Sequence, residues 1–495
     1  MASVNFFPKG NIPVEVCPVR YGKSMLYSEC TDTIATNAVF GELCMFKYNI
    51  KATAFFNNYN SANNSLAGNF HKSGRVDLGV YFPTDRWFKD GLVALIPDYT
   101  ATAWTSAGAT AFANAVQGQS KPARYPNHGQ ELYDISGGVY GYDTINGVSG
   151  SNLLDEFNGL CSLVIDHYNS ITGFNPSFFS YRNGQNVSPI VYMPYFLGAR
   201  NSDFSTEGDA NTFYGDVGFP NEVIDRAKMV NRPSTTRWWD FWHALGSGTK
   251  QESIDYSVQE FEKTAVNNGW FNNFIHWHTA STSDLEEYFT MMGVLADEYE
   301  VHRSSYLEAI EYLWFKECIK RVTAKEVSGN IEVYIEMRDI MKGGNISGIP
   351  TDIITELIRT PISLKINLDG TVLSGADIDC STGYCLKNNN EIIFEVPLSN
   401  YKEGFLKVVL KPTNSPDYIN FDKPTISYHP SEDGLTIETD QETKIVLYGS
   451  SSGSEYDAID LYRSESFETI HVSDAQDVKF IGAINRFGAS NLISI

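Results

Sequence analysis

Apolar and polar positions alternate in two different ways along this chain, and the change divides it into two parts. Up to about residue 326, short apolar runs that fit β-strands are followed by stretches with the three-to-four-residue spacing of helices. Beyond it, apolar residues recur at every second position, and Gly, Asn, Asp and Pro separate the runs. The first part therefore predicts an α/β barrel, and the second predicts all-β sandwiches.

The start of the barrel part carries a complete strand–helix–strand unit. A short strand is expected at residues 24–27, followed by polar residues, by helical spacing over 34–46, and by a second strand at 52–56. Barrels of this kind keep their chemistry at the carboxyl ends of their strands, so Glu29 and Asp32 are candidates for binding a cation or taking a proton. The same two carboxylates could instead cap the helix that follows them.

The rest of the barrel part repeats this alternation of strands and helices. The helix expected at 152–170 should end at Gly173, with Pro176 beyond it. Further strands are expected at 76–81, 92–96, 177–184, 190–197 and 269–278, and further helices at 100–117, 253–267, 283–297 and 303–324.

The change of period sets the expected domain boundaries. Eight alternating runs lie between residues 331 and 484, and a break near residues 411–416 divides them into two modules. The expected domains are an N-terminal arm at 1–21, the barrel at 22–326, and β-sandwich modules at 327–411 and 412–495.

Composition narrows the classes of partner. A chain of 495 residues should form two to four domains, and aromatic residues make up 13% of it, which suggests broad aromatic surfaces as well as a core. The net charge of −23 argues against nucleic acid, since phosphate binding needs clustered Lys and Arg. It also disfavours adsorption to an anionic membrane.

Cysteine usage and hydropathy bear on the compartment. The seven Cys are scattered without CxxC spacing, so free thiols are expected, although Cys380 and Cys385 could close a small loop. The first residues lack the pattern of a signal peptide, and no window of 18 apolar residues predicts a membrane span. If the protein works outside the cell, we expect it to leave by another route, such as lysis.

Candidate chemistry recurs at several strand ends and loops of the barrel part. Each candidate also has a structural reading: His128 could be a surface histidine, Arg182 could simply pair with a carboxylate, and His276 shares a strand face with His278 that suits either a site or a core. The Trp-rich loop at 238–242 could stack on sugar or fill the core.

Four sequence motifs follow one another in the barrel part: MLYSECTDT with KATAFF, then NHGQEL, then HYNSITGFNPSFFSYRNG, and finally FIHWHTASTSDLEEYFTMMG. Their order and spacing resemble those of the NodB-homology polysaccharide deacetylases, over residues of about 20–300. The resemblance implies an irregular NodB-like (β/α) barrel that removes N- or O-acetyl groups from glycans.

The resemblance also implies roles for individual residues. A divalent metal, Zn²⁺ by preference, would be held by Asp32 and His128, with Glu29 as general base, Arg182 orienting that base and His276 as general acid. The residues expected to contact the sugar are Tyr181, Trp239, Trp242 and Trp277.

The chain departs from the family pattern at two positions. Cys30 stands where the metal-binding Asp is expected, and Leu132 stands where a second metal-binding His is expected. Zinc enzymes need three protein ligands and an open position for water. Cys30, Asp32, His128 and Glu131 could together meet that need.

The function expected from the sequence is that of a polysaccharide-deacetylase-like protein that acts on or binds a bacterial surface polysaccharide. An acidic, aromatic-rich chain without a signal peptide suggests a bacteriophage virion component, with other virion subunits as partners and no nucleic acid or membrane. One alternative is a catalytically degraded barrel that serves as a structural or glycan-binding tail protein. Another is a bacterial carbohydrate-active enzyme exported by a different route.

Overall fold

The computed structural model describes the following residues: 7–31, 48–56, 67–68, 71, 76–82, 165–181, 196–200, 250–266, 270–274, 282–337, 356–383, 385–401, 405–418, 424–432, 434–440, 443–449, 458–464, 470–472, 478–484 and 493–495. The strand expected at 92–96 and the helices expected at 34–46 and 100–117 lie outside them, as do residues 190–195 of the strand expected at 190–197, whose last two residues precede the observed strand Gly198–Arg200.

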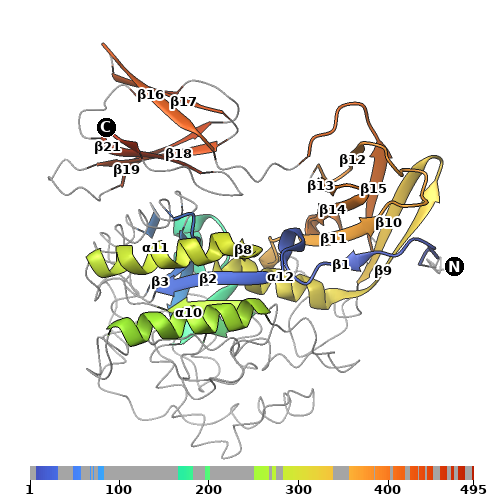
Figure 1. Cartoon of the computed structure of the whole chain (residues 1–495), viewed down its shortest axis with the longest axis horizontal. Helices are drawn as coiled ribbons and strands as arrows, with labels where there is room; N and C mark the ends of the chain where they lie inside the picture. Colours follow the sequence, from blue (N-terminus) through green and yellow to red (C-terminus); the bar gives the residue numbers. More distant parts are fainter. Residues whose placement is uncertain are drawn as a thin grey trace, which may run out of the picture.

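Strands of the first part form one curled, parallel, seven-stranded sheet (Figure 1). Its order is β6-β5-β4-β3-β2-β7, and β8 pairs with the beginning of β2. Every pairing between these strands is parallel, so their carboxyl ends meet at one edge of the sheet. The strands are β2 (Met25–Thr31), β3 (Ala52–Phe56), β4 (Val76–Phe82), β5 (Phe178–Tyr181), β6 (Gly198–Arg200), β7 (Trp270–Phe274) and β8 (Val301–Arg303).

Helices cover this sheet on both faces. On one face, the ring of Tyr27 in β2 packs edge-on against Phe261 of α10, with centroids 5.6 Å apart. On the other face, Tyr306 at the start of α12 packs against Phe178 of β5 at 4.6 Å and Trp270 of β7 at 4.9 Å. The sheet is therefore buried on both sides, as parallel sheets usually are. The helices are α10 (Lys250–Val266), α11 (Thr282–Glu298) and α12 (Tyr306–Cys318).

The second part begins with an antiparallel sandwich of two four-stranded sheets. The sheet orders are β1-β11-β14-β13 and β12-β15-β10-β9. The strands are β1 (Glu15–Val16), β9 (Ile319–Val327), β10 (Asn330–Met337), β11 (Ile362–Asn367), β12 (Ile378–Cys380), β13 (Cys385–Asn388), β14 (Glu391–Val396) and β15 (Phe405–Pro412). Cys380 and Cys385 are both buried free thiols.

A second antiparallel unit follows, with sheet orders β16-β17-β20 and β19-β18-β21-β22. Its two sheets enclose a separate apolar cluster that includes Ile437 of β17, Leu447 of β18 and Ile481 of β21. The strands are β16 (Ile426–Ser431), β17 (Gly434–Thr439), β18 (Thr443–Gly449), β19 (Ala458–Ser464), β20 (Ile470–Val472), β21 (Val478–Ile484) and β22 (Ile493–Ser494).

Two expected elements differ from the observed ones. The helix expected over 303–324 ends at Cys318, and β9 begins at once at Ile319, because the β-branched residues of this segment pair along β10. The strand expected to end at Tyr27 continues as β2 to Thr31, and all of its residues are buried. Tertiary pairing thus overrides the local helical period in one segment and extends the strand in the other.

The expected arm is part of the first sandwich. Its residues 15–16 form β1, which pairs with β11, and Ile12 bridges to Ala324 of β9. A single buried apolar cluster runs from the parallel sheet through α12 into this sandwich and includes Phe55, Trp314 and Phe394. The domain boundaries at 326/327 and 411/412 stay predictions, with β9 lying mostly before the first of them.

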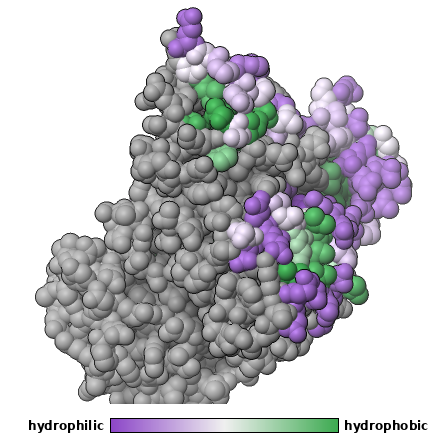
Figure 2. All heavy atoms as spheres, turned by 60° about the vertical axis from the view of Figure 1, so that its left-hand side comes forward, coloured by the Kyte–Doolittle hydropathy of each residue, from purple (hydrophilic) through white to green (hydrophobic). Residues whose placement is uncertain are grey.

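Large apolar side chains with high exposure are few among the described residues. They are Val266, Val294, Val372 and Ile495, from four separate segments. On the face shown in Figure 2, apolar groups of the described residues are bordered by hydrophilic ones. Within the described part, no helix is long and apolar enough to cross a membrane.

A buried ion pair joins the arm to the sandwich. Arg20 donates from Nε to Glu395 Oε1 at 2.5 Å and from an Nη to the other carboxylate oxygen at 3.3 Å. The Glu395 side chain is only 1% exposed. Such a two-point contact fixes the arm against β14, because a guanidinium matches a carboxylate in geometry as well as in charge.

Replacing Glu395 by Ala should destabilise the protein by about 3 kcal/mol, since the buried Arg20 charge loses its two-point partner. Urea unfolding would measure this loss. The control is Asp379→Ala, which removes an exposed ion pair with Lys411 (3.2 Å) and should cost less than about 1 kcal/mol. Equal losses in the two variants would contradict the prediction.

Candidate functional site

The carboxyl edge of the parallel sheet gathers the strands that precede the predicted site residues. Asp32 comes directly after β2, Arg182 directly after β5, and His276 two positions after β7. Strands β2 and β7 are neighbours, and β5 lies on the far side of β3 and β4. The carboxyl ends of β2, β5 and β7 therefore lie at one edge of the sheet.

Most of the predicted site side chains lie outside the described residues. These are Asp32, His128, Arg182, Trp239, Trp242, His276 and Trp277. Tyr181 is the last residue of β5 and pairs with Phe82 of β4. Glu29 is the one predicted catalytic residue whose side chain is described.

Glu29 lies within β2, on the face of the sheet that α10 and α11 cover. Its Oε1 accepts hydrogen bonds from the hydroxyls of Tyr27 at 2.6 Å and of Tyr288 at 2.7 Å. Its Oε2 accepts one from Nδ2 of Asn273 at 3.2 Å. Since Tyr288 belongs to α11, the carboxyl group is enclosed between β2, β7 and that helix.

The surroundings of Glu29 change its acidity. Complete burial raises the pKa of the Glu29 carboxyl to about 7, and the hydrogen bonds from Tyr27, Tyr288 and Asn273 partly oppose that rise. Burial and the neighbouring Glu29 also raise the pKa of both tyrosines well above their ordinary value. A general base needs access to the proton it takes, whereas these oxygens are occupied by three donors. The role of Glu29 as a base stays a prediction without geometric support.

The opposite face, which we call the inner face, is the one on which Tyr306 of α12 packs against Trp270, and it carries Ser28 and Cys30. The Trp270 indole donates to Ser28 Oγ at 3.1 Å, and the Cys30 thiol donates to the carbonyl of Asn273 at 3.3 Å. Asn272, 2% exposed, lies beside Cys30, and its Nδ2 has no hydrogen-bond partner among the described residues. Cys30 therefore lies on the inner face, at the position where the resemblance places an acid.

The described residues do not make a metal site by themselves. Among them, no group of three or more His, Cys, Asp and Glu side chains is placed to hold a metal ion. A catalytic zinc needs three protein ligands, and the inner-face residues just described offer a single thiol, from Cys30. The metal remains a prediction that depends on Asp32 and His128.

A second cluster of charges lies at the amino edge of the sheet, where α12 begins. The first turn of α12 is a capping box in which Ser305 caps the helix and Glu308 reaches back to it. The Glu308 carboxylate also accepts a hydrogen bond from Lys51 at 2.7 Å and lies 3.7 Å from Arg20. Lys51 is in turn 3.9 Å from Asp77 of β4.

These charges shift the pKa of their neighbours. Burial alone would raise the pKa of Glu308, but Lys51, Arg20 and His302 together lower it to about 2. Burial, with the nearby Arg20 charge, lowers the pKa of His302 to about 3. At neutral pH the Glu308 carboxylate is therefore charged and the His302 ring is neutral.

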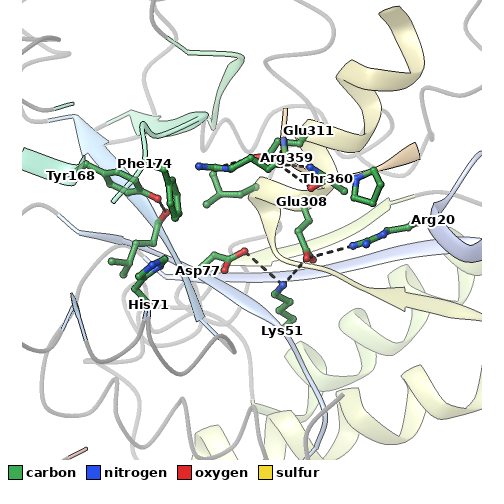
Figure 3. Close-up of a pocket in the computed structure, with 13 residues that line it drawn as sticks. Arg20, Lys51, His71, Asp77, Tyr168, Phe174, Glu308, Glu311, Arg359 and Thr360 are labelled. Atoms are coloured by element: carbon green, nitrogen blue, oxygen red, sulfur yellow. Dashed lines mark hydrogen bonds and ion pairs between the residues drawn. The ribbon is translucent and has the colours of Figure 1, made fainter. Parts of the chain in front are cut away.

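This cluster at the amino edge is not among the residues predicted from the sequence. The Ser305-x-x-Glu308 pattern is a readable signal for a helix start. Nothing in the sequence shows that Arg20, Lys51 and Asp77 meet there, because they come from the arm and from two separate strand segments. The residues around this cluster enclose a cavity of about 290 Å³ (Figure 3).

Comparisons with known proteins give structural likeness only. No known protein family and no curated protein matches the sequence. A structure described as a cellobiose-phosphate cleavage protein from Enterococcus faecalis is 14% identical, covers 57% of this chain and 97% of its own, and has a TM-score of 0.30. A structure described as a polysaccharide deacetylase from Mycobacterium smegmatis is 9% identical, covers 61% and 96%, and has a TM-score of 0.33. With such low identities and TM-scores, these likenesses say nothing about substrate or activity.

Replacing Glu29 by Gln should change how stability depends on pH. Folding raises the pKa of this carboxyl from 4.5 to about 7, so the protonated form stabilises the fold fully below about pH 4.5 and this contribution is lost as pH rises through 7. Gln mimics the protonated carboxyl and does not titrate. Between pH 4.5 and 7, the free energy of unfolding of the wild type should fall relative to the variant by up to about 3 kcal/mol.

Urea unfolding at several pH values would test this. The control is Glu298→Gln, because Glu298 is an exposed residue at the end of α11. Its curve should run parallel to that of the wild type. Parallel curves for wild type and Glu29→Gln would show that Glu29 does not titrate in this range.

Proposed function

We propose that this chain is a carbohydrate-active protein whose barrel acts on, or binds, a bacterial surface polysaccharide in the manner of a deacetylase. The observation that supports the proposal is the parallel pairing of the sheet, which sets the carboxyl ends of β2, β5 and β7 at one edge, and Asp32, Arg182 and His276 follow these strands in the sequence. Active sites of α/β barrels lie at that edge.

The local geometry of two motifs supports the proposal. Residues 165–172 are helical, and Gly173 has a φ of +79° and donates from its backbone N–H to the Asn169 carbonyl at 2.7 Å. The helix thus ends at Gly173 as the motif expects, and β5 follows Pro176. The segment KATAFF contains β3, which pairs with the carboxyl half of β2.

The residues that follow these strands in the sequence would each have a separate role in the proposed reaction. Asp32 and His128 would hold a divalent metal, which supplies a water of lowered pKa when bound. Arg182 would orient a carboxylate base, and His276 would protonate the leaving amine or alcohol. Tyr181, Trp239, Trp242 and Trp277 would contact the sugar. A role in a virion, with other virion subunits as partners, belongs to the same proposal.

A second candidate function is glycan binding without turnover. Two observations favour it. The Glu29 carboxyl is enclosed on the helix face, and Cys30 lies on the inner face where an acid is expected. In that case the barrel binds the glycan without catalysing its deacetylation.

A measurement of acetate release would test whether the chain is a deacetylase. The substrates are acetylated chitooligosaccharides and bacterial surface polysaccharide, each with and without added Zn²⁺ or Co²⁺. We expect metal-dependent release that is abolished in Asp32→Asn and His128→Ala and falls about 10²–10⁴-fold in His276→Ala, which removes the general acid. The matched control is His471→Ala, an exposed histidine on β20 of the second sandwich, which should act like wild type.

The other outcomes separate the two candidates. Glycan binding without acetate release would establish the binding protein. Neither binding nor release by a correctly folded chain would overturn both.

A further inference from the structure

The cavity shown in Figure 3 lies at the amino edge of the parallel sheet, whereas the active site is predicted beyond the carboxyl ends of the strands. Lys51 directly precedes β3 and Asp77 is the second residue of β4, so both stand where strands begin. The first turns of α12 and the segment 359–361, which leads into β11, form the other walls. The volume, about 290 Å³, suits a ligand of monosaccharide size.

The charges that line the cavity balance. Among the described residues that line it, three are cations and three are carboxylates: Arg20, Lys51, Arg359, Asp77, Glu308 and Glu311. Arg20 is held by Glu395 and Glu308, and Arg359 is held by Glu311 at 2.8 Å. These residues therefore offer no net charge of either sign to pair with a charged ligand, and a neutral ligand avoids the cost of placing an uncompensated charge there.

Asp77 presents its carboxylate to the cavity. Its carboxylate accepts no hydrogen bond from any other described residue, and its nearest cation, Lys51 Nζ, is 3.9 Å away, too far for a direct hydrogen bond. Its side chain is 28% exposed, and that of Lys51 is 18% exposed. A donor beside an unsatisfied acceptor at this distance suits neighbouring hydroxyl groups, because each hydroxyl both donates and accepts.

One wall of the cavity is aromatic. The Phe174 ring lies 5.2 Å from the ring of His71 and 5.8 Å from that of Tyr168, and Arg359 stacks on it at 3.9 Å. The Tyr168 hydroxyl donates a hydrogen bond to the carbonyl of Leu78 at 2.7 Å. Arg359 covers one face of Phe174, and the remaining ring atoms of the half-buried Phe174 and His71 form the apolar part of this wall, beside Lys51 and Asp77.

We propose that this cavity binds a neutral, polyhydroxylated ligand of monosaccharide size, with neighbouring hydroxyls bridging Lys51 and Asp77. The site is separate from the predicted active site, so the proposal goes beyond the proposed function and does not depend on turnover. Because the walls come from the arm, the barrel strands and the segment leading to the sandwich, an occupant would tie these parts together and stabilise the fold.

Calorimetric titration and thermal unfolding of the full chain would test the site. The neutral probes are glucose and N-acetylglucosamine, and the charged probes are glucosamine, glucuronate and glycine. We expect a neutral sugar to bind and to raise the Tm, with affinity at least about tenfold weaker in Asp77→Ala, because a hydrogen bond to a charged group is lost. Asp77→Asn keeps the shape of the side chain and serves if the Ala variant folds poorly.

Two control variants locate the binding. Asp379→Ala removes another Asp that is paired with a Lys, in the sandwich, and should bind like wild type. His276→Ala alters the predicted active site and should also leave this binding unchanged.

Three results would overturn the proposal: binding of only the charged or zwitterionic probes, no binding of any probe, or sugar binding that is lost in His276→Ala and kept in both Asp77 variants. The last result would place the sugar in the predicted active site. Absence of acetate release would instead concern the proposed function alone.

Discussion

The buried carboxylate of Glu311 joins the barrel to the first sandwich, and the rest of the structure depends on its contacts. It is almost completely buried on α12 and accepts five hydrogen bonds. One comes from Ser177, just before β5, and the others come from Arg359 and Thr360, just before β11. A buried carboxylate is tolerated only when its oxygens are satisfied in this way. The requirement holds a barrel strand, a helix and the entry to the sandwich at fixed distances.

The two edges of the parallel sheet consequently have different roles: one joins the parts of the protein, and the other precedes the predicted site. At the amino edge, Glu308 and Glu311 are used with Arg20, Lys51 and Arg359 to join the arm, the barrel and the sandwich. At the carboxyl edge, the strand ends are followed by the residues in which we expect chemistry. This division agrees with the general rule that barrels keep stability at one end and catalysis at the other. The cavity at the amino edge is the exception that we propose as a ligand site.

The two-residue alternation of a strand decides what each polar residue of β2 can do. Glu29 and Tyr27 point toward α10 and α11, whereas Ser28 and Cys30 point to the inner face. Moving a carboxyl group by one position along this strand would place it on the other face. A sequence motif that is matched one position out of register therefore assigns a residue to the wrong face of the sheet.

The sequence by itself determined the parts of this protein that depend on local interactions. The strand at 52–56, the helix end at Gly173, the helix at α11 and the alternating strands after residue 330 follow from period, propensity and turn residues close together in the chain. The tertiary structure decided the rest. The switch from helix to strand after Cys318, the face on which Glu29 lies, and the pairing of Arg20 with Glu395, 375 residues away, all depend on distant partners. Those partners supply hydrogen bonds and burial, which outweigh the weak local preferences that sequence patterns record.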